Sequence, residues 1–381
     1  MTARHDPVRG ARVWGAPGRA AQEFAVKGTL ESVAPYGGGH INDSYCAVFE
    51  QGGRRERFLL QRINTHVCPD PAVLMENIER VTTHIAGKVP GGGRRVLTLV
   101  RARDVRDGQG GRAGQPGRAL LADEDGQFWR MYRFIEGARS HDVVEDAVQA
   151  YEAARAFGEF QRMLADLPAP RLHETISDFH NTPKRLAALK RAVEEDALGR
   201  AEGAQREIGF ALERESVTRL LVEAGLPERV THNDTKINNV LLDERTGEGI
   251  CVIDLETTMP GLAPFDFGDM VRTMSCRAAE DERDLSLVRM EMEMFEALAR
   301  GYLSAADFLL DLEKRMLVQA GRVITLEQGI RFLTDYLEGD TYFKVHRAGQ
   351  NLDRARAQFR LEESLEENAA AMERVVEGAE G

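Results

Sequence analysis

Polar side chains gather beside an apolar stretch in the segment VTHNDTKINNVLLD, residues 230–243. Asp234 lies five residues before Asn239, and Asp254 ends the next apolar stretch, GICVID. The turn sequence between the two stretches predicts a short hairpin over 240–256. Such a hairpin would return Asp254 toward Asn239. Because carboxylate and amide groups are costly to remove from water, their convergence indicates a functional site.

Two carboxylates and one amide oxygen suit a particular chemistry. Hard oxygen ligands of this kind bind Mg²⁺, which proteins usually hold through one or two side chains together with nucleotide phosphates. Phosphoryl transfer needs an Asp that orients and deprotonates a hydroxyl, and an Asn and an Asp on the metal. The alternative is a polar turn with an Asx-type cap, which accounts for Asn238 or Asp243 but not for three separated groups.

The elements that would position these residues divide the chain into two lobes. The expected elements are strands at 57–64 and 94–102, hairpins at 118–137 and 240–256, and helices at 71–87, 144–168, 183–200, 206–224 and from 266 onward. Residues 1–24 are rich in Arg, Gly and Pro, and we expect them to form a mobile tail. The pattern predicts an α+β fold with a small β-rich N-lobe at 25–136 and a larger, mostly helical C-lobe at 137–381.

The composition narrows the class of protein. The net charge of −12 argues against a general binder of nucleic acids or anionic membranes. No apolar run approaches the roughly 20 residues that a membrane-spanning helix needs. The four cysteines show neither a C-x-x-C pair nor a regular framework, so we expect free thiols in a cytoplasmic protein. We also expect a monomer.

Five motifs taken together resemble one family of kinases. They are HNDTKINNVLLD, VIDLETTMPGLAPFDFGD, YGGGHIND, LLQRINTHVCPDPAVLMENI and IRFLTDYLEGDTYFKV. The first two resemble motifs of the aminoglycoside phosphotransferase and choline kinase superfamily, and the combination resembles the N-acetylhexosamine 1-kinases over residues 33–345. The resemblance implies a protein-kinase-like two-lobed fold. It also implies phosphoryl transfer from ATP, with Mg²⁺, to the anomeric C1 hydroxyl of GlcNAc or GalNAc.

The resemblance also implies roles for the polar residues. Asp234 would be the catalytic base, and Asn239 and Asp254 would hold Mg²⁺. Asp266 would anchor the catalytic loop through its backbone, and His232 would fix the same loop. For Lys236, a phosphate contact and simple exposure to solvent remain equal alternatives.

The nucleotide would be bound by the N-lobe. Gly37, Gly38 and Gly39 form the glycine-rich turn, although Asn42 stands where a kinase has its third glycine. Arg62 occupies the position of the strand lysine that grips phosphates, and arginine can also bind phosphate; a surface arginine on a strand edge is the alternative. Its partner would be Glu76 or Glu79. The adenine would pack against Tyr132, Phe134 or Ile135, which could equally belong to the core.

Four residues match positions that contact the sugar in the hexosamine kinases. They are His40, Asn42, Arg331 and Tyr342. A salt-bridged helix residue is the alternative for Arg331. Acidic residues around it, Asp335, Glu338 and Asp340, keep a cationic acceptor open as a rival. The segment ISDFHNT, residues 176–182, could help to close the site, and the loop at 103–118 is assigned no function.

Two other functions therefore remain open. The first is a kinase of the same superfamily acting on an aminoglycoside, choline or another amino alcohol, or another sugar. The second is a catalytically silent nucleotide-binding protein, which the missing strand lysine and the imperfect glycine loop leave possible.

Overall fold

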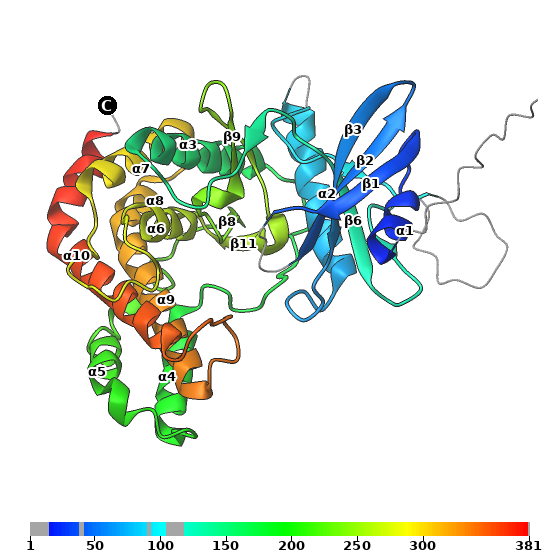
Figure 1. Cartoon of the computed structure of the whole chain (residues 1–381). Coiled ribbons are helices and arrows are strands. Elements are labelled where there is room, and N and C mark those ends of the chain that lie inside the picture. Colours follow the sequence, from blue (N-terminus) through cyan, green and yellow to red (C-terminus); the bar gives the residue numbers. More distant parts are fainter. Residues whose placement is uncertain (1–14, 38–41, 90–92, 104–117, 380–381) are drawn as a thin grey trace, which may run out of the picture. The chain divides into compact units, whose positions relative to one another are not determined.

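The computed structural model describes residues 15–37, 42–89, 93–103 and 118–379 (Figure 1). The predicted site residues Gly38, Gly39 and His40, and most of the loop at 103–118, lie outside the described residues. The chain forms two compact units: unit 1 comprises residues 1–79 and 97–135, and unit 2 comprises residues 80–96 and 136–381.

Unit 1 is built on an antiparallel sheet with the strand order β1-β2-β3-β6-β4, and β5 pairs with β6. The strands are β1 (Thr29–Pro35), β2 (Asp43–Gln51), β3 (Arg54–Arg62), β4 (Leu99–Val100), β5 (Leu121–Ala122) and β6 (Phe128–Arg133). Alternation along β3 places Phe58 and Leu60 in a buried cluster with Trp129 and Met131. The expected strand at 94–102 is shortened to β4, because its pairing with β6 covers two residues.

The helix α1 (Ala16–Gln22) corrects one expectation. Residues 1–24 were expected to form a mobile tail, but Ala20, Ala21 and Phe24 are buried in the same cluster as the sheet. Burial of these apolar side chains holds α1 in place, since apolar surface removed from water stabilises the folded state.

The helix α2 (Pro71–Lys88) begins in unit 1 and ends in unit 2. Asp70 caps it, because its Oδ1 accepts hydrogen bonds from Ala72 N and Val73 N, both at 3.1 Å. The predicted helix at 71–87 is therefore confirmed.

Unit 2 is mostly helical. Its helices are α3 (Ala147–Leu164), α4 (Thr182–Glu195), α5 (Gln205–Glu213), α6 (Ala263–Met274), α7 (Met292–Ala305), α8 (Asp311–Arg315), α9 (Leu317–Glu338) and α10 (Gln350–Gly378). Short 3-10 helices are η1 (Glu202–Ala204), η2 (Val217–Arg219), η3 (Ile237–Asn239) and η4 (Leu255–Thr257). The helix α9 packs against α4, α6 and α10 and is buried along most of its length.

Two small sheets interrupt the helices of unit 2. One has the order β10-β9-β7 and the other pairs β8 with β11. Their strands are β7 (Ala138–Arg139), β8 (Glu228–Thr231), β9 (Val240–Asp243), β10 (Gly249–Val252) and β11 (Met259–Leu262). The strands β9 and β10 are antiparallel, and Gly247 in their connection has φ of +76°, so the predicted hairpin is confirmed.

The helical and strand content confirms the α+β prediction. All four cysteines are free thiols, as expected. Among the described residues, no helix has the length and apolar character that crossing a membrane requires.

Candidate active site

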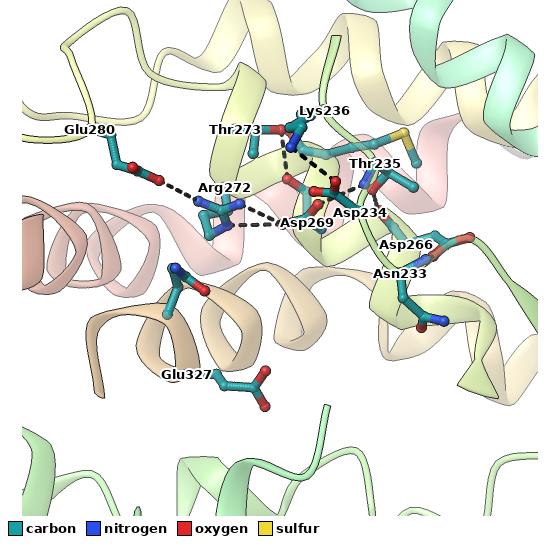
Figure 2. Close-up of polar contacts among 12 residues, drawn as sticks. Asn233, Asp234, Thr235, Lys236, Asp266, Asp269, Arg272, Thr273, Glu280 and Glu327 are labelled. Atoms are coloured by element: carbon teal, nitrogen blue, oxygen red, sulfur yellow. Dashed lines mark hydrogen bonds and ion pairs between the residues drawn. The ribbon is translucent and has the colours of Figure 1, made fainter. Parts of the chain in front are cut away.

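Asp266, a buried residue in the first turn of α6, holds the loop that carries Asp234 (Figure 2). Its Oδ2 accepts a hydrogen bond from His232 N at 2.9 Å, and its Oδ1 accepts one from Asn233 N at 2.7 Å. Gln161 Nε2 donates a third, at 2.6 Å, to Oδ2. Burial raises the pKa of Asp266, while the nearby His232 and these donors act in the opposite direction.

The next loop residue is held by the following turn of α6. Thr235 N donates to Asp269 Oδ2 at 2.7 Å, and Thr235 Oγ1 donates to the carbonyl of Asp266 at 2.6 Å. Asp269 is in turn bound by Arg272, whose Nε lies 2.9 Å from Asp269 Oδ1. The backbone on both sides of Asp234 is thus fixed by two carboxylates of one helix.

The His232 ring is fixed in place by packing and by hydrogen bonds to the backbone. It is fully buried and packs edge-on against Phe157 and Phe160. Its Nε2 lies 2.9 Å from the carbonyl oxygen of Ile253, and its Nδ1 lies 3.3 Å from Asp234 N. A carbonyl can only accept and a backbone N–H can only donate, so the ring is held as the tautomer protonated on Nε2.

Asp234 is partly exposed, with 23% of its side chain accessible. Its Oδ2 accepts hydrogen bonds from Asn239 Nδ2 at 2.9 Å and from Lys236 Nζ at 2.9 Å. Burial acts to raise the pKa of Asp234, but the charge and hydrogen bond of Lys236 lower it on balance. Lys236 therefore binds the predicted base, a contact that neither of the two alternatives for Lys236 included.

The hairpin brings Asp254 back to the end of the loop. Val240 pairs with Val252, and Ile253 N donates to the carbonyl of Asn239 at 2.9 Å. Asp254 follows in the left-handed conformation, with φ of +61°. The pKa of Asp254 is raised well above its ordinary value. Burial is the largest cause, followed by the charge of Glu256, a hydrogen bond with Glu256 and the charge of Asp234.

These groups fit a hard divalent cation. The Nδ2 of Asn239 donates a hydrogen bond to Asp234, so the Oδ1 of Asn239 is the atom that would bind a cation. The carboxyl of Asp254 is held near two other carboxylates, an arrangement that a cation would stabilise. No group of three or more His, Cys, Asp or Glu in the described part of the chain is arranged to hold a metal. Mg²⁺ needs only one or two protein groups where nucleotide phosphates supply other ligands.

The comparison with known families assigns this arrangement to a class of enzymes. Residues 32–308, which include the whole loop and hairpin, match the model of the phosphotransferase enzyme family. The chain belongs to the phosphotransferase enzyme family. It is therefore an enzyme of the kinase type, and the match does not specify the acceptor.

Solved structures share the fold of this phosphotransferase. A microcompartment-associated aminopropanol kinase is 15% identical, with a TM-score of 0.58 and coverage of 93% of this chain and 97% of that one. An aminoglycoside phosphotransferase from Alicyclobacillus acidocaldarius is 12% identical, with a TM-score of 0.58 and coverage of 97% and 98%. A spectinomycin phosphotransferase, solved with ADP and spectinomycin, is 11% identical, with a TM-score of 0.52 and coverage of 95% and 97%. The likeness concerns the fold, and it confirms the predicted protein-kinase-like architecture with a β-rich N-lobe and a helical C-lobe.

The residues predicted to bind nucleotide lie in unit 1 of the phosphotransferase. Gly37 has φ of +74°, which suits a tight turn. Tyr132 and Ile135 are buried, and the Phe134 ring lies 5.3 Å from that of Tyr36. Asn42, predicted to contact the sugar, is buried and accepts a hydrogen bond from a backbone N–H of the chain after β3.

The expected partner of Arg62 is corrected by the structure. Arg62 Nε donates to Asp43 Oδ2 at 2.9 Å, and Asp43 lies directly opposite Arg62 in the β2–β3 register. Among the described residues this carboxylate, rather than Glu76 or Glu79, is its partner, because directly opposite residues in adjacent strands are nearest neighbours. Glu79 instead accepts a hydrogen bond from Ala119 N at 3.0 Å.

A buried arginine on the neighbouring strand was not singled out by the sequence. Arg130 on β6 is 1% exposed, and its Nε and Nη2 donate to Gln61 Oε1 at 2.9 and 2.8 Å. Its guanidinium lies 5.3 Å from the centre of the Tyr132 ring. The register places Arg130 on the same face of the sheet as Gln61 and Tyr132, opposite to the face of Arg62.

Arg331 and Tyr342 line one cavity of about 160 Å³ in unit 2. The other lining residues are Arg185, Ala188, Thr334, Asp335, Glu338 and Phe343. The Arg331 guanidinium lies 5.9 Å from the Tyr342 ring centre, so the structure brings the two predicted acceptor contacts together. Asp335 is occupied by the backbone, since it accepts hydrogen bonds from the N–H groups of the three residues 341–343.

Several supporting residues were missed by the sequence reasoning. Asp269 lies three residues after Asp266, on the same face of α6, and that spacing could have identified it. Glu256 lies two residues after Asp254 in the 3-10 helix η4, where strand alternation does not apply, and no spacing rule pointed to it. Gln161 carried no signal, because it lies 105 residues from the carboxylate that it binds.

Proposed function

We propose that the chain is an ATP- and Mg²⁺-dependent kinase that transfers the γ-phosphoryl group of ATP to the anomeric C1 hydroxyl of GlcNAc or GalNAc. Membership of the phosphotransferase enzyme family supports the reaction type. In this proposal residues 25–136 bind the nucleotide, residues 137–381 supply the catalytic loop and the acceptor site, and the protein is a cytoplasmic monomer.

The observation that carries the proposal is the environment of Asp234. Its Oδ2 is held by Asn239 and Lys236, which leaves Oδ1 to accept the proton of the acceptor hydroxyl. The lowered pKa keeps the carboxyl ionised at neutral pH, so it can act as a proton acceptor. The Asp234 side chain is partly exposed, as the approach of a substrate hydroxyl requires.

Asn239 Oδ1 and the Asp254 carboxylate would hold Mg²⁺. When bound, the metal offsets the negative charge on the transferred phosphoryl group. Lys236 lies close enough to influence Asp254 as well as Asp234, so it supplies further positive charge at the same place.

The acceptor side is supported by the cavity that Arg331 and Tyr342 line. Their guanidinium and phenol are directional hydrogen-bonding groups, which a neutral sugar with hydroxyls and an acetamide requires.

A screen of acceptors tests the proposal. ADP release would be measured with Mg-ATP and GlcNAc, GalNAc, glucose, choline or kanamycin. We expect turnover with GlcNAc or GalNAc, and loss of that turnover in Asp234→Asn. Turnover confined to choline or kanamycin would contradict the proposed acceptor, and ATP binding without ADP release from any acceptor would favour a catalytically silent protein.

One observation favours the amino alcohols or aminoglycosides as a second candidate class. Glu338 is exposed and lines the same cavity as the Tyr342 and Phe343 rings. A carboxylate beside aromatic rings is an environment that attracts an ammonium group. If this class is correct, Glu338→Gln should raise the KM for choline or kanamycin and leave the KM for ATP unchanged.

A further inference from the structure

A buried histidine in the segment 176–182 joins the catalytic loop to α9. His180 Nδ1 lies 2.8 Å from Glu327 Oε1, and His180 Nε2 lies 3.1 Å from the carbonyl oxygen of Asn233. The two side chains are 6% and 2% exposed. Thr182 Oγ1 donates to the other carboxylate oxygen of Glu327 at 2.6 Å.

Both neighbours of the His180 ring are hydrogen-bond acceptors. A carbonyl oxygen and a carboxylate accept hydrogen bonds and donate none, so both ring nitrogens are satisfied only when both carry a proton. Burial acts to raise the pKa of Glu327, but His180 and the charge of Arg331 lower it on balance. Arg185 also interacts electrostatically with this carboxylate. The pair is therefore a buried, charge-assisted contact.

The carbonyl that His180 binds belongs to the peptide that leads into Asp234. Asn233 has φ of +66°, a conformation that residues other than glycine rarely adopt and that surrounding contacts must maintain. Asp266 holds the N–H of Asn233, and His180 holds its carbonyl. The N–H of the same peptide makes a longer bond, from Asp234 N to His232 Nδ1 at 3.3 Å. Loss of the His180 contact would leave the peptide with this weaker restraint, so it could rotate and move the Asp234 side chain with it.

The second partner of His180, Glu327, lies on α9, the helix that carries the predicted acceptor contact Arg331. Glu327 lies four residues, or one helical turn, before Arg331 on α9. Figure 2 shows Glu327 on a helix separate from the loop residues Asn233 and Asp234. His180 therefore spans the distance between the loop of the predicted base and the helix of a predicted acceptor contact.

We propose that His180 and Glu327 are positioning residues that orient Asp234 by holding the peptide that precedes it, and that tie this peptide to the helix bearing Arg331. The inference rests on the proposed role of Asp234 as the base. It adds a function for the 176–182 segment, whose role the motifs left open.

The test compares His180→Gln and Glu327→Gln with Lys184→Gln. Lys184 forms an exposed ion pair with Asp178 in the same region, so its variant controls for a general disturbance of the segment. Hydrogen exchange of the full chain, followed by mass spectrometry, would report on residues 230–243 without any acceptor. We expect faster exchange of this segment in the His180 and Glu327 variants and no change in the Lys184 variant.

Steady-state ADP release supplies the second readout. We expect kcat to fall about 10- to 100-fold in both variants, with the KM for ATP unchanged, because a displacement of about 1 Å at a catalytic group can have this effect. In an Asp234→Asn background neither variant should lower the residual rate further. Unchanged exchange of 230–243, unchanged kcat, or an equal loss in the Asp234→Asn background would overturn the inference. Failure of every acceptor in the wild type would refute the proposed function and leave the exchange result to decide the positioning of the loop.

Discussion

Replacing Asp266 by Asn tests the loop anchor most directly, because the side chain keeps its shape and loses its charge. If the new amide nitrogen takes the place of Oδ1, the bond from Asn233 N is lost. If it takes the place of Oδ2, the bonds from His232 N and Gln161 Nε2 are lost. In either orientation at least one buried backbone N–H faces another donor.

The cost follows from these contacts. An unsatisfied buried donor costs about 1–3 kcal/mol, and each remaining hydrogen bond loses about 1 kcal/mol when its acceptor becomes neutral. The loss of the buried charge offsets part of this destabilisation, since burial disfavours the ionised form of Asp266 and raises its pKa. We therefore expect Asp266→Asn to lower the free energy of unfolding by about 2–3 kcal/mol.

Urea unfolding at neutral pH measures this change. Asp142→Asn is the matched control, because Asp142 is exposed and the same chemical change there should cost less than about 0.5 kcal/mol. The displaced loop should also lower kcat. An Asp266→Asn protein with the stability and kcat of the wild type would refute the anchoring role.

Three further predictions concern the base, the packing of α6 and one thiol. Asp234→Asn should lower kcat by about two or more orders of magnitude, with nucleotide affinity nearly unchanged in a binding titration. Gly268→Ala should lower the free energy of unfolding by about 1–3 kcal/mol, because a Cβ there would lie 2.4 Å from a backbone oxygen of α9; Gly203→Ala, with open space, is the control. Burial raises the pKa of Cys251 to about 12, so its thiol stays protonated at about pH 8 and should alkylate far more slowly than that of the partly exposed Cys276 in peptide mapping by mass spectrometry.

A specific result would contradict each of these three predictions. Full turnover in Asp234→Asn would remove it as the base. Equal stability of the two glycine variants would mean that α6 and α9 separate without cost. Alkylation of Cys251 as fast as that of Cys276 below about pH 9 would show that the thiol is not buried in the folded protein.

The sequence predicted the elements that depend on local patterns. The hairpin of β9 and β10 followed from two apolar stretches around Gly247, and α2 followed from Asp70 and the helical spacing after it. In the tail, α1 was missed because its stability comes from packing on the sheet, which a short Arg- and Gly-rich segment does not reveal.

The contacts that were missed join residues distant in sequence. His180 and Glu327 are 147 residues apart, and no spacing rule connects them. The partner of Arg62 was assigned to a helix because the kinase resemblance suggested it, whereas the strand register places Asp43 opposite. The family match establishes the enzyme class. In the proposed function, the choice of acceptor depends on a few side chains around one cavity, which neither the fold nor the motif spacing determines.

The enclosure of α9 limits how this enzyme could change its acceptor. Two of its glycines, Gly321 and Gly329, lie against side chains of α6 and α10, and at Gly329 a Cβ would meet a phenyl ring at 2.4 Å. Mutations inside the helix would therefore disturb the fold before they altered specificity. With the proposed acceptor site, evolution toward a new acceptor, in nature or in a library, would be confined to the rim of the cavity, where Ala188, Glu338 and Tyr342 can vary with little cost to stability.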